Sequence, residues 1–254
     1  MNWKRPIVSA VPVLALFSVW ELLSRTELLD PLLFPPPSVL LAAAWGMLAS
    51  GELPAQIRAT MTRTLAGCLI GSLLGFFTGL LMGGVRMVRW FLEPVVSALN
   101  STPKLTLLPM AMLFLGIGDA ARVALIAASA FIVLAIHAVD AARSVQASYV
   151  ELAVNYGARR RDLLRRVYLP AALPQVFTGL RIALGRALVI TVSVEIVGSS
   201  DGLGSMIWLA WQTLTTEKLY VGVLVTASIG ALLHGGLQRL EGLLIPWKRT
   251  ANAR

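Results

Sequence analysis

Six long apolar stretches, each free enough of charge to cross a lipid bilayer, are the feature that most constrains this chain's fold. A membrane-spanning helix needs about 20 mostly apolar residues, because the hydrocarbon core of a bilayer is about 30 Å thick. The stretches are residues 7–23, 65–85, 95–115, 123–139, 176–197 and 219–237. The sequence therefore predicts an all-α, polytopic membrane protein with six transmembrane helices.

The first and third stretches need separate interpretation. Residues 1–23 resemble a signal peptide, but no small-residue cleavage site follows before Glu21, so an uncleaved signal anchor is expected. Pro103, Lys104 and Pro109 interrupt the third stretch. Because proline removes a helical hydrogen bond, this stretch is either one interrupted span or a short interfacial helix followed by a span that starts near Leu105.

Composition excludes several classes of function. Charged residues make up 14% of the 254 residues, well below the share of about a quarter that soluble domains carry. Six spans leave no room for a separate soluble catalytic domain, so a non-enzyme is predicted. The single cysteine, Cys68, and the isolated histidines His137 and His234 lie on apolar segments. Neither a disulfide framework nor a metal site is expected, and His137 is instead expected to make a polar contact with Asp140 and Arg143.

Basic residues predict the orientation of the spans. With six spans, most lysines and arginines fall on one side of the membrane, and cytoplasmic loops are the ones enriched in these residues. Both termini are therefore expected in the cytoplasm. This side carries Lys4, Arg5, Arg86, Arg89, the cluster of residues 143–166, Arg239, Lys248, Arg249 and Arg254. Because topology accounts for the net charge of +9, nucleic-acid binding is not expected.

The largest cytoplasmic loop contains the polar segment ELAVNYGARRRDLLRRVYLPAALP, residues 151–174. Ser148 and Glu151 have capping-box spacing, which predicts that a helix starts there. Gly157 is expected to end this helix in a left-handed conformation. A second amphipathic, arginine-rich turn follows, and Pro170 and Pro174 are expected to end it and redirect the chain into the fifth span.

This loop has two interpretations. A basic juxtamembrane helix lying on anionic lipid is common. A docking element for a soluble partner is the alternative, and the glutamate start, glycine hinge and paired prolines favour it, because a lipid-surface helix requires none of them.

The loop resembles the signature E-A-A-x-x-x-G-A followed by L-P-x-x-x-P, which belongs to the membrane subunits of binding-protein-dependent ABC importers. Leu152 replaces the second alanine of the signature. The resemblance covers residues 60–247. The segments PKLTLLPMAMLFLGIG, residues 103–118, and VEIVGSSDGLG, residues 194–204, are similar to the nitrate, sulfonate, taurine and bicarbonate branch. The matching residues are Glu151, Ala153, Gly157, Ala158, Leu169, Pro170 and Pro174.

The resemblance implies a type I ABC importer permease fold in a bacterial inner membrane. Residues 1–59 would form an anchor span and a periplasmic loop. Residues 60–247 would form a core of five spans. A coupling loop within it, at about 141–175, would dock on an ATPase dimer, and residues 248–254 would form a cytoplasmic tail. It also implies a permease homodimer, an external solute-binding protein, and a small oxyanion such as a sulfonate or nitrate as substrate.

The chain contains no G-x-x-x-x-G-K-[ST] phosphate-binding loop. It is therefore expected to bind no cofactor, and ATP and Mg²⁺ are expected on the partner ATPase.

Ionisable residues inside a span are costly and are candidates for function. Arg181, near the cytoplasmic end of the fifth span, is expected to extend its charge to the interface. Arg186 is either a structural contact to another helix or a cavity residue that meets an anionic substrate. Glu195, near the outer end, is expected to hold the neighbouring loop GSSDGLG, residues 198–204. That loop is expected to be flexible and to contact the binding protein.

Two other classes of protein fit the sequence less well. A secondary transporter that needs no ATPase would show related halves with broken helices, and no convincing internal repeat is present. An intramembrane enzyme would need a nucleophile and base or a metal cluster on facing spans. An importer of a thiamine-precursor-like heterocycle remains an alternative, because such importers have similar permeases.

Overall fold

The computed structural model describes residues 4–247, apart from the side chains of residues 4–10, Ala147, Arg160 and Leu164. The predicted tail, residues 248–254, lies outside this part of the chain. All regular structure in the described residues is helical, as the apolar stretches predicted. The helices are α1 (Lys4–Arg25), α2 (Pro37–Ala49), α3 (Glu52–Gly84), α4 (Arg86–Ser101), η1 (Lys104–Leu107), α5 (Leu108–Leu115), α6 (Asp119–Arg143), α7 (Ala147–Asn155), α8 (Arg160–Leu163), η2 (Leu164–Tyr168), α9 (Leu169–Gly198), α10 (Leu203–Gln212) and α11 (Thr216–Leu244).

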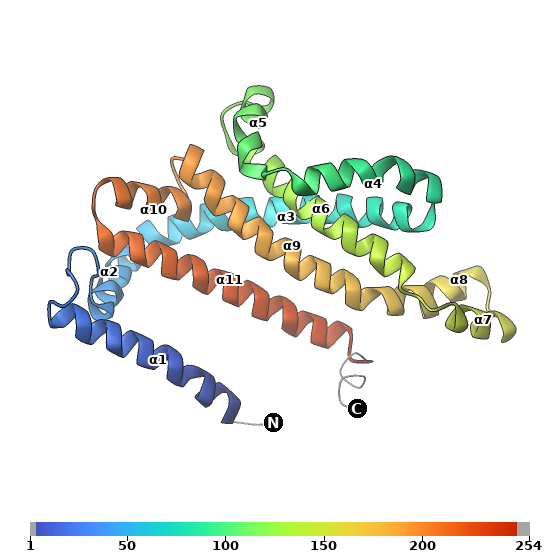
Figure 1. Cartoon of the computed structure of the whole chain (residues 1–254), viewed down its shortest axis with the longest axis horizontal. Coiled ribbons are helices and arrows are strands. Elements are labelled where there is room, and N and C mark those ends of the chain that lie inside the picture. Colours follow the sequence, from blue (N-terminus) through green and yellow to red (C-terminus); the bar gives the residue numbers. More distant parts are fainter. Residues whose placement is uncertain (1–3, 248–254) are drawn as a thin grey trace.

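The long helices run along one common direction (Figure 1). Helices α3, α6 and α9 pack together as the centre of the molecule, and α11 lies beside α9. Helices α7 and α8 project at one end, which we call the loop end, and α10 lies at the opposite, far end. Helices α3, α6 and α11 are long and apolar enough to cross a membrane by length and composition, and α9 has 30 residues.

A ridge of glycines brings α3 close to α6. The ridge repeats every four residues, so its members lie on one face of α3. At Gly75 a methyl group would lie only 2.4 Å from the carbonyl oxygen of Phe131, so nothing larger than hydrogen fits. Small residues at this spacing allow backbones to approach in membrane helices. The ridge consists of Gly67, Gly71, Gly75, Gly79 and Gly83.

The third apolar stretch is interrupted at Pro103, as its prolines predicted, but within this stretch no helix long enough to span the bilayer follows the break. The chain is helical in α4, is interrupted at Thr102 and Pro103, and resumes as the short helices η1 and α5. Helix α5 has eight residues and is therefore only about 12 Å long, too short to cross a bilayer. Helix α4 runs back beside only part of α3 before the chain turns away into α5 (Figure 1).

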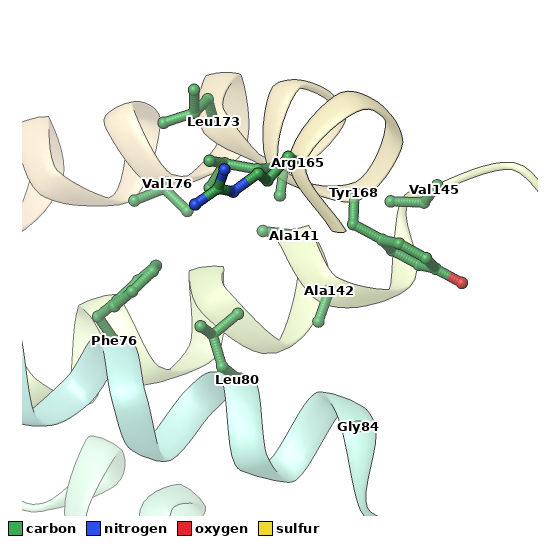
Figure 2. Close-up of a pocket in the computed structure, with 12 residues that line it drawn as sticks. Phe76, Leu80, Gly84, Ala141, Ala142, Val145, Arg165, Tyr168, Leu173 and Val176 are labelled. Atoms are coloured by element: carbon green, nitrogen blue, oxygen red, sulfur yellow. The ribbon is translucent and has the colours of Figure 1, made fainter. Parts of the chain in front are cut away.

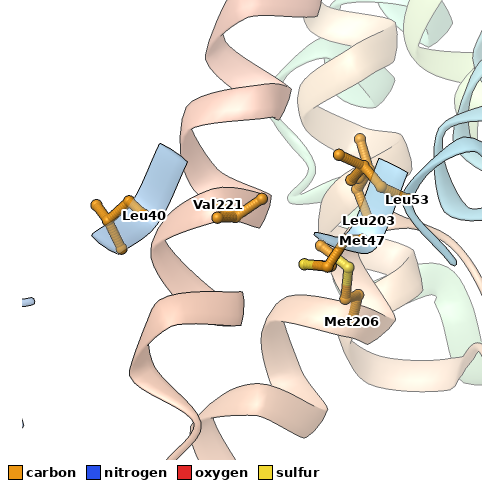
Figure 3. Close-up of a cluster of buried hydrophobic side chains, with 6 residues drawn as sticks. All are labelled: Leu40, Met47, Leu53, Leu203, Met206 and Val221. Carbon is orange, nitrogen blue, oxygen red and sulfur yellow. The ribbon is translucent and has the colours of Figure 1, made fainter. Parts of the chain in front are cut away.

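The connection after the first span contains helix α2. A cluster of buried side chains joins α2 and the start of α3 to α10 and α11 (Figure 3). Helix α1 contacts α11 through Trp20 and Tyr220, whose ring centroids lie 5.4 Å apart. The far end is thus a packed unit. The cluster consists of Leu40, Met47, Leu53, Leu203, Met206 and Val221.

Candidate docking loop and charged sites

The end of α7 is a Schellman motif, a specific hydrogen-bonded helix terminus. Gly157 has a φ of +78°. Its N–H donates to the carbonyl of Val154 at 2.9 Å, and the Ala158 N–H donates to the carbonyl of Ala153 at 3.0 Å. These are the two bonds that define the motif. Three of the predicted docking residues therefore belong to one motif. Gly157 adopts the left-handed conformation, and Ala153 and Ala158 are joined by the second hydrogen bond.

The start of α7 differs from the prediction. Helix α7 begins at Ala147, with Gln146 as its N-cap and no capping bond from a side chain, so the predicted capping box of Ser148 and Glu151 is wrong. The backbone of Gln146 is already extended, which places the helix start two residues before Ser148 would cap it. Glu151 lies exposed in the middle of the helix.

Helix α7 exposes large apolar side chains at the loop end. Leu152 and Tyr149 are each 57% exposed and Tyr156 is 85% exposed. These residues lie in the segment between the long helices α6 and α9, and the arginines of α8 and η2 follow directly. Exposed apolar patches bordered by polar residues mark interaction surfaces.

The remaining predicted docking residues belong to α9. Pro170 lies in its first turn and Pro174 lies inside it, so the prediction that these prolines end a helix is wrong. Helix α8 instead continues through a π-helical turn, η2, into α9 at Leu169.

A cavity of about 520 Å³ lies beside this junction (Figure 2). Phe76 and Leu80 of α3 line it together with Val176 of α9. Arg165 reaches over it from η2, with Tyr168 close by. The π-helical turn therefore borders this cavity.

At the far end, Glu195 is fully buried and binds three groups. Its carboxylate accepts hydrogen bonds from Thr60 Oγ1 at 2.8 Å, from Arg63 Nη1 at 2.9 Å and from the Gly204 N–H at 3.1 Å. The structure therefore places Glu195 where it holds the start of α10 against α3 and α9.

Arg63 is the centre of this cluster and is only 4% exposed. It also donates to Asp119 at 2.7 Å and to the Asp201 carboxylate at 2.6 Å. Arg122 pairs with Asp119 at 2.8 Å and donates to the Gly198 carbonyl. The guanidinium of Arg63 thus joins α3, the start of α6, α9 and the loop after α9. Arg63 is not among the site residues predicted from the sequence, although its charge just before an apolar run was a usable signal.

The loop after α9 is fixed by hydrogen bonds, unlike the flexible loop that its glycines predicted. The Gly202 N–H donates to Gln56 Oε1 at 2.6 Å, and the Leu203 N–H donates to Thr60 Oγ1 at 2.8 Å. The hydrogen bond from Arg63 holds the pKa of Asp201 below its usual value, although partial burial acts in the opposite direction. Side chains of α3 therefore determine the shape of this loop.

The ionisable residues of α9 have different environments. Arg181 pairs with Glu241 of α11, which differs from the predicted extension to the interface. The Glu241 carboxylate of the neighbouring helix neutralises the Arg181 charge, so Arg181 does not need to reach the interface. Arg186 is exposed, and it forms no hydrogen bond or ion pair with any residue that the structure describes. Glu195 lies nine positions further along, at the far end.

The predicted contact of His137 with Asp140 and Arg143 is wrong, because His137 Nδ1 faces Gln175 Nε2 at 3.3 Å. Among residues 4–247, no group of three His, Cys, Asp or Glu side chains is placed to hold a metal ion.

The long helices, the broken third segment and the exposed loop together characterise the fold. The fold is that of ABC transporter permeases. A crystal structure of an amino acid ABC transporter superimposes with a TM-score of 0.62 at 18% identity, over 80% of this chain and 97% of that one. Residues 71–246 match the family of binding-protein-dependent transport system inner membrane components, and the chain belongs to this family.

Two relatives are named for chemically different substrates. The taurine transport system permease protein of Escherichia coli is 32% identical over 97% of this chain and 94% of its own length. The riboflavin transport system permease protein of Chloroflexus aurantiacus is 32% identical over 86% of this chain and 81% of its own length.

The present chain is therefore a permease subunit of an ABC importer and not an enzyme. ATP hydrolysis belongs to a separate ATPase subunit.

Proposed function

We propose that α7 is the element through which the ATPase subunit drives this permease, and that the loop end faces the cytoplasm. The exposed apolar face of α7 supports the docking role more than any other observation. A helix that only lay on lipid would insert its apolar face among the headgroups. It would not need its C-terminus fixed by a two-bond glycine cap.

The placement of basic residues supports the orientation. Arg86 and Arg89 at the start of α4, and the arginines of α8 and η2, all lie at the loop end. This end is enriched in positive charge, as cytoplasmic loops are. Both chain termini then face the cytoplasm, and the Arg63 cluster faces the opposite side, where a solute-binding protein would dock near Asp201.

The connection from α7 to α9 suggests how force is transmitted. Only the turn of residues 156–159 separates α7 from α8, and α8 continues through η2 into α9 without a break, so a displacement of α7 would reach α9 through a short hydrogen-bonded turn. In the proposed cycle, ATP-driven closure of the ATPase dimer draws two copies of α7 together. The permease dimer then changes between inward-facing and outward-facing arrangements by rigid-body rotation. ATP and Mg²⁺ bind to the ATPase in this scheme, and this chain binds no cofactor.

We further propose that two copies of this chain form the pathway and that the substrate is a small organic oxyanion of the sulfonate type. Similarity to the taurine permease supports this class. A heterocycle is the alternative substrate, since one relative is a riboflavin permease. The unpaired positive charge of Arg186 favours the anion.

The docking role is tested at Gly157 with two substitutions of similar size. In Gly157→Val, a β-branched side chain must adopt a positive φ, which should open the Schellman motif. Asparagine tolerates this conformation, so Gly157→Asn is the matched control. We expect the valine variant to lose both the co-purified ATPase and substrate uptake, and the asparagine variant to retain both. Unchanged ATPase recovery and uptake with valine would refute the docking role and favour an ATPase-independent transporter.

A further inference from the structure

One face of α9 is exposed and carries a positive charge. Val189 and Val197 on this face are 65% and 62% exposed, and Ile182 is 39% exposed. Arg186 lies among them, at the spacing that places residues on one side of a helix. The opposite face of α9 is buried against α3 and α6, so Arg186 points away from the packed centre.

A second positive charge lies close to Arg186. Lys104 is on η1, and Leu107 of the same short helix belongs to the group of side chains that packs with Ile190 and Val194 of α9. Because η1 packs directly against α9, Lys104 and Arg186 lie on adjoining elements, where their like charges repel. The Lys104 ammonium donates to the carbonyl of Asn100 at 2.7 Å, and it has no carboxylate partner among the described residues.

Both charges lie at membrane depth. Arg186 is about 25 Å along α9 from Leu169 and about 18 Å from its other end at Gly198. Lys104 follows α4, which runs about 24 Å back from the loop end. A charge at this depth is costly unless it faces water or a partner charge. The interrupted backbone at Thr102 and Pro103 leads to the same conclusion, because non-helical backbone at this depth lies in protein or beside a water-filled cavity.

Among the described residues, no unpaired carboxylate lies deep in a long helix. Every described Asp or Glu lies in a loop or within about two turns of a helix end. Glu93, which lies deepest in its helix, is paired with Arg89 at 3.0 Å, and Glu195 is paired with Arg63. A mobile anion can supply the counter-charge that the described residues do not.

We propose that Lys104 and Arg186 form the anion-binding site of the translocation pathway and hold the sulfonate, or a similar oxyanion group, of the substrate. This assignment rests on the proposed function as an oxyanion importer. Guanidinium groups bind planar pairs of oxygens through two parallel hydrogen bonds, and an ammonium adds a point charge. The exposed valines and Ile182 beside Arg186 suit the short apolar body of an organic sulfonate.

The test uses the complete importer, permease with its ATPase and binding protein, in proteoliposomes with radiolabelled taurine as probe. We expect Arg186→Gln and Lys104→Gln each to lower the uptake rate by about tenfold or more, as expected for loss of a charged hydrogen bond. Arg186→Lys keeps the charge and should retain a substantial part of the uptake. ATP hydrolysis stimulated by the loaded binding protein should stay within about twofold of the native value in all three variants.

Each outcome distinguishes the proposals. If the native importer takes up taurine and both glutamine variants take it up at the same rate, the anion site is refuted and the importer function stands. A parallel loss of ATP hydrolysis, or an Arg186→Lys variant as inactive as Arg186→Gln, would show a structural role and also overturn the site. Absence of taurine uptake by a native importer that hydrolyses ATP would overturn the site together with the oxyanion class, while the ATPase docking at α7 would stand.

Discussion

Replacing Arg63 with methionine is expected to lower the stability of the folded chain by about 3–5 kcal/mol. Methionine keeps similar length and helix propensity but removes the charge. Glu195, which is 0% exposed, would retain its bonds from Thr60 and Gly204 but lose its only ion-pair partner among the described residues. A buried carboxylate without a counter-charge carries most of the cost of its removal from water.

Cys68 provides the assay for this prediction. It is the single cysteine of the chain, and it is 5% exposed between α3 and α6. A fluorogenic thiol dye therefore reacts only after this core opens, so melting of the detergent-purified protein can be followed without further engineering. For a chain of this size, each 1 kcal/mol corresponds to about 2–4 °C, so the expected decrease in melting temperature is about 6–20 °C.

Two further variants isolate the cause. Arg58 lies five residues before Arg63, is exposed and forms no ion pair with a described residue, so Arg58→Met should melt within about 2 °C of the native protein. Adding Glu195→Gln to Arg63→Met removes the isolated buried charge and should restore more than half of the lost stability. A native melting temperature in Arg63→Met, or a double variant less stable than Arg63→Met, would refute this reasoning.

Two other predictions concern packing and pH. Gly75→Ala should lower the free energy of unfolding by about 1–3 kcal/mol because its methyl group meets the Phe131 carbonyl. Gly46→Ala places its methyl group in open space on α2 and should instead raise the free energy of unfolding by about 0.5–1 kcal/mol. If both variants shift the melting temperature equally in the thiol-dye assay, the close contact of α3 with α6 at Gly75 is contradicted. The pKa of Asp201 is lower in the folded chain than in the unfolded chain, because Arg63 donates to it. The stabilisation that ionised Asp201 gives the folded chain is therefore present above the unfolded pKa and is lost as pH falls through the folded pKa. Melting temperatures measured from pH 7 to pH 3 should fall less steeply for Asp201→Asn than for the native protein, and parallel curves would contradict this linkage.

Hydropathy predicted where most long helices lie, because a bilayer requires about 20 apolar residues whatever their order. The left-handed Gly157 was also predictable, since its signal is local. The glycine ridge of α3 was readable from the spacing of Gly67, Gly71 and Gly75 but was not used. The break at Pro103 was recognised as an interruption, but hydropathy alone cannot show that the chain turns away there.

The charged cluster at the far end was not predictable from local patterns. Arg63 and Glu195 are 132 positions apart in sequence, and Arg63 and Asp201 are 138 apart. Their pairing depends on how α3 packs against α9, which follows from the glycine contacts with α6. The same applies to Lys104 and Arg186, because their proximity depends on how η1 packs against α9.

The proposed roles of α7 and of the anion site are connected through α9. This helix is about 45 Å long and is attached at both ends. At the loop end, the π-helical turn and Pro174 each weaken the regular hydrogen-bond pattern. At the far end, Glu195 binds it to α3 and α10. A displacement of α7 would therefore turn α9 about its weakened start and not bend its centre. Arg186 lies between these two points, whereas Lys104 lies on a different element, η1. The separation of the two charges would then change with each ATPase stroke, and so would the affinity of the site for an anion.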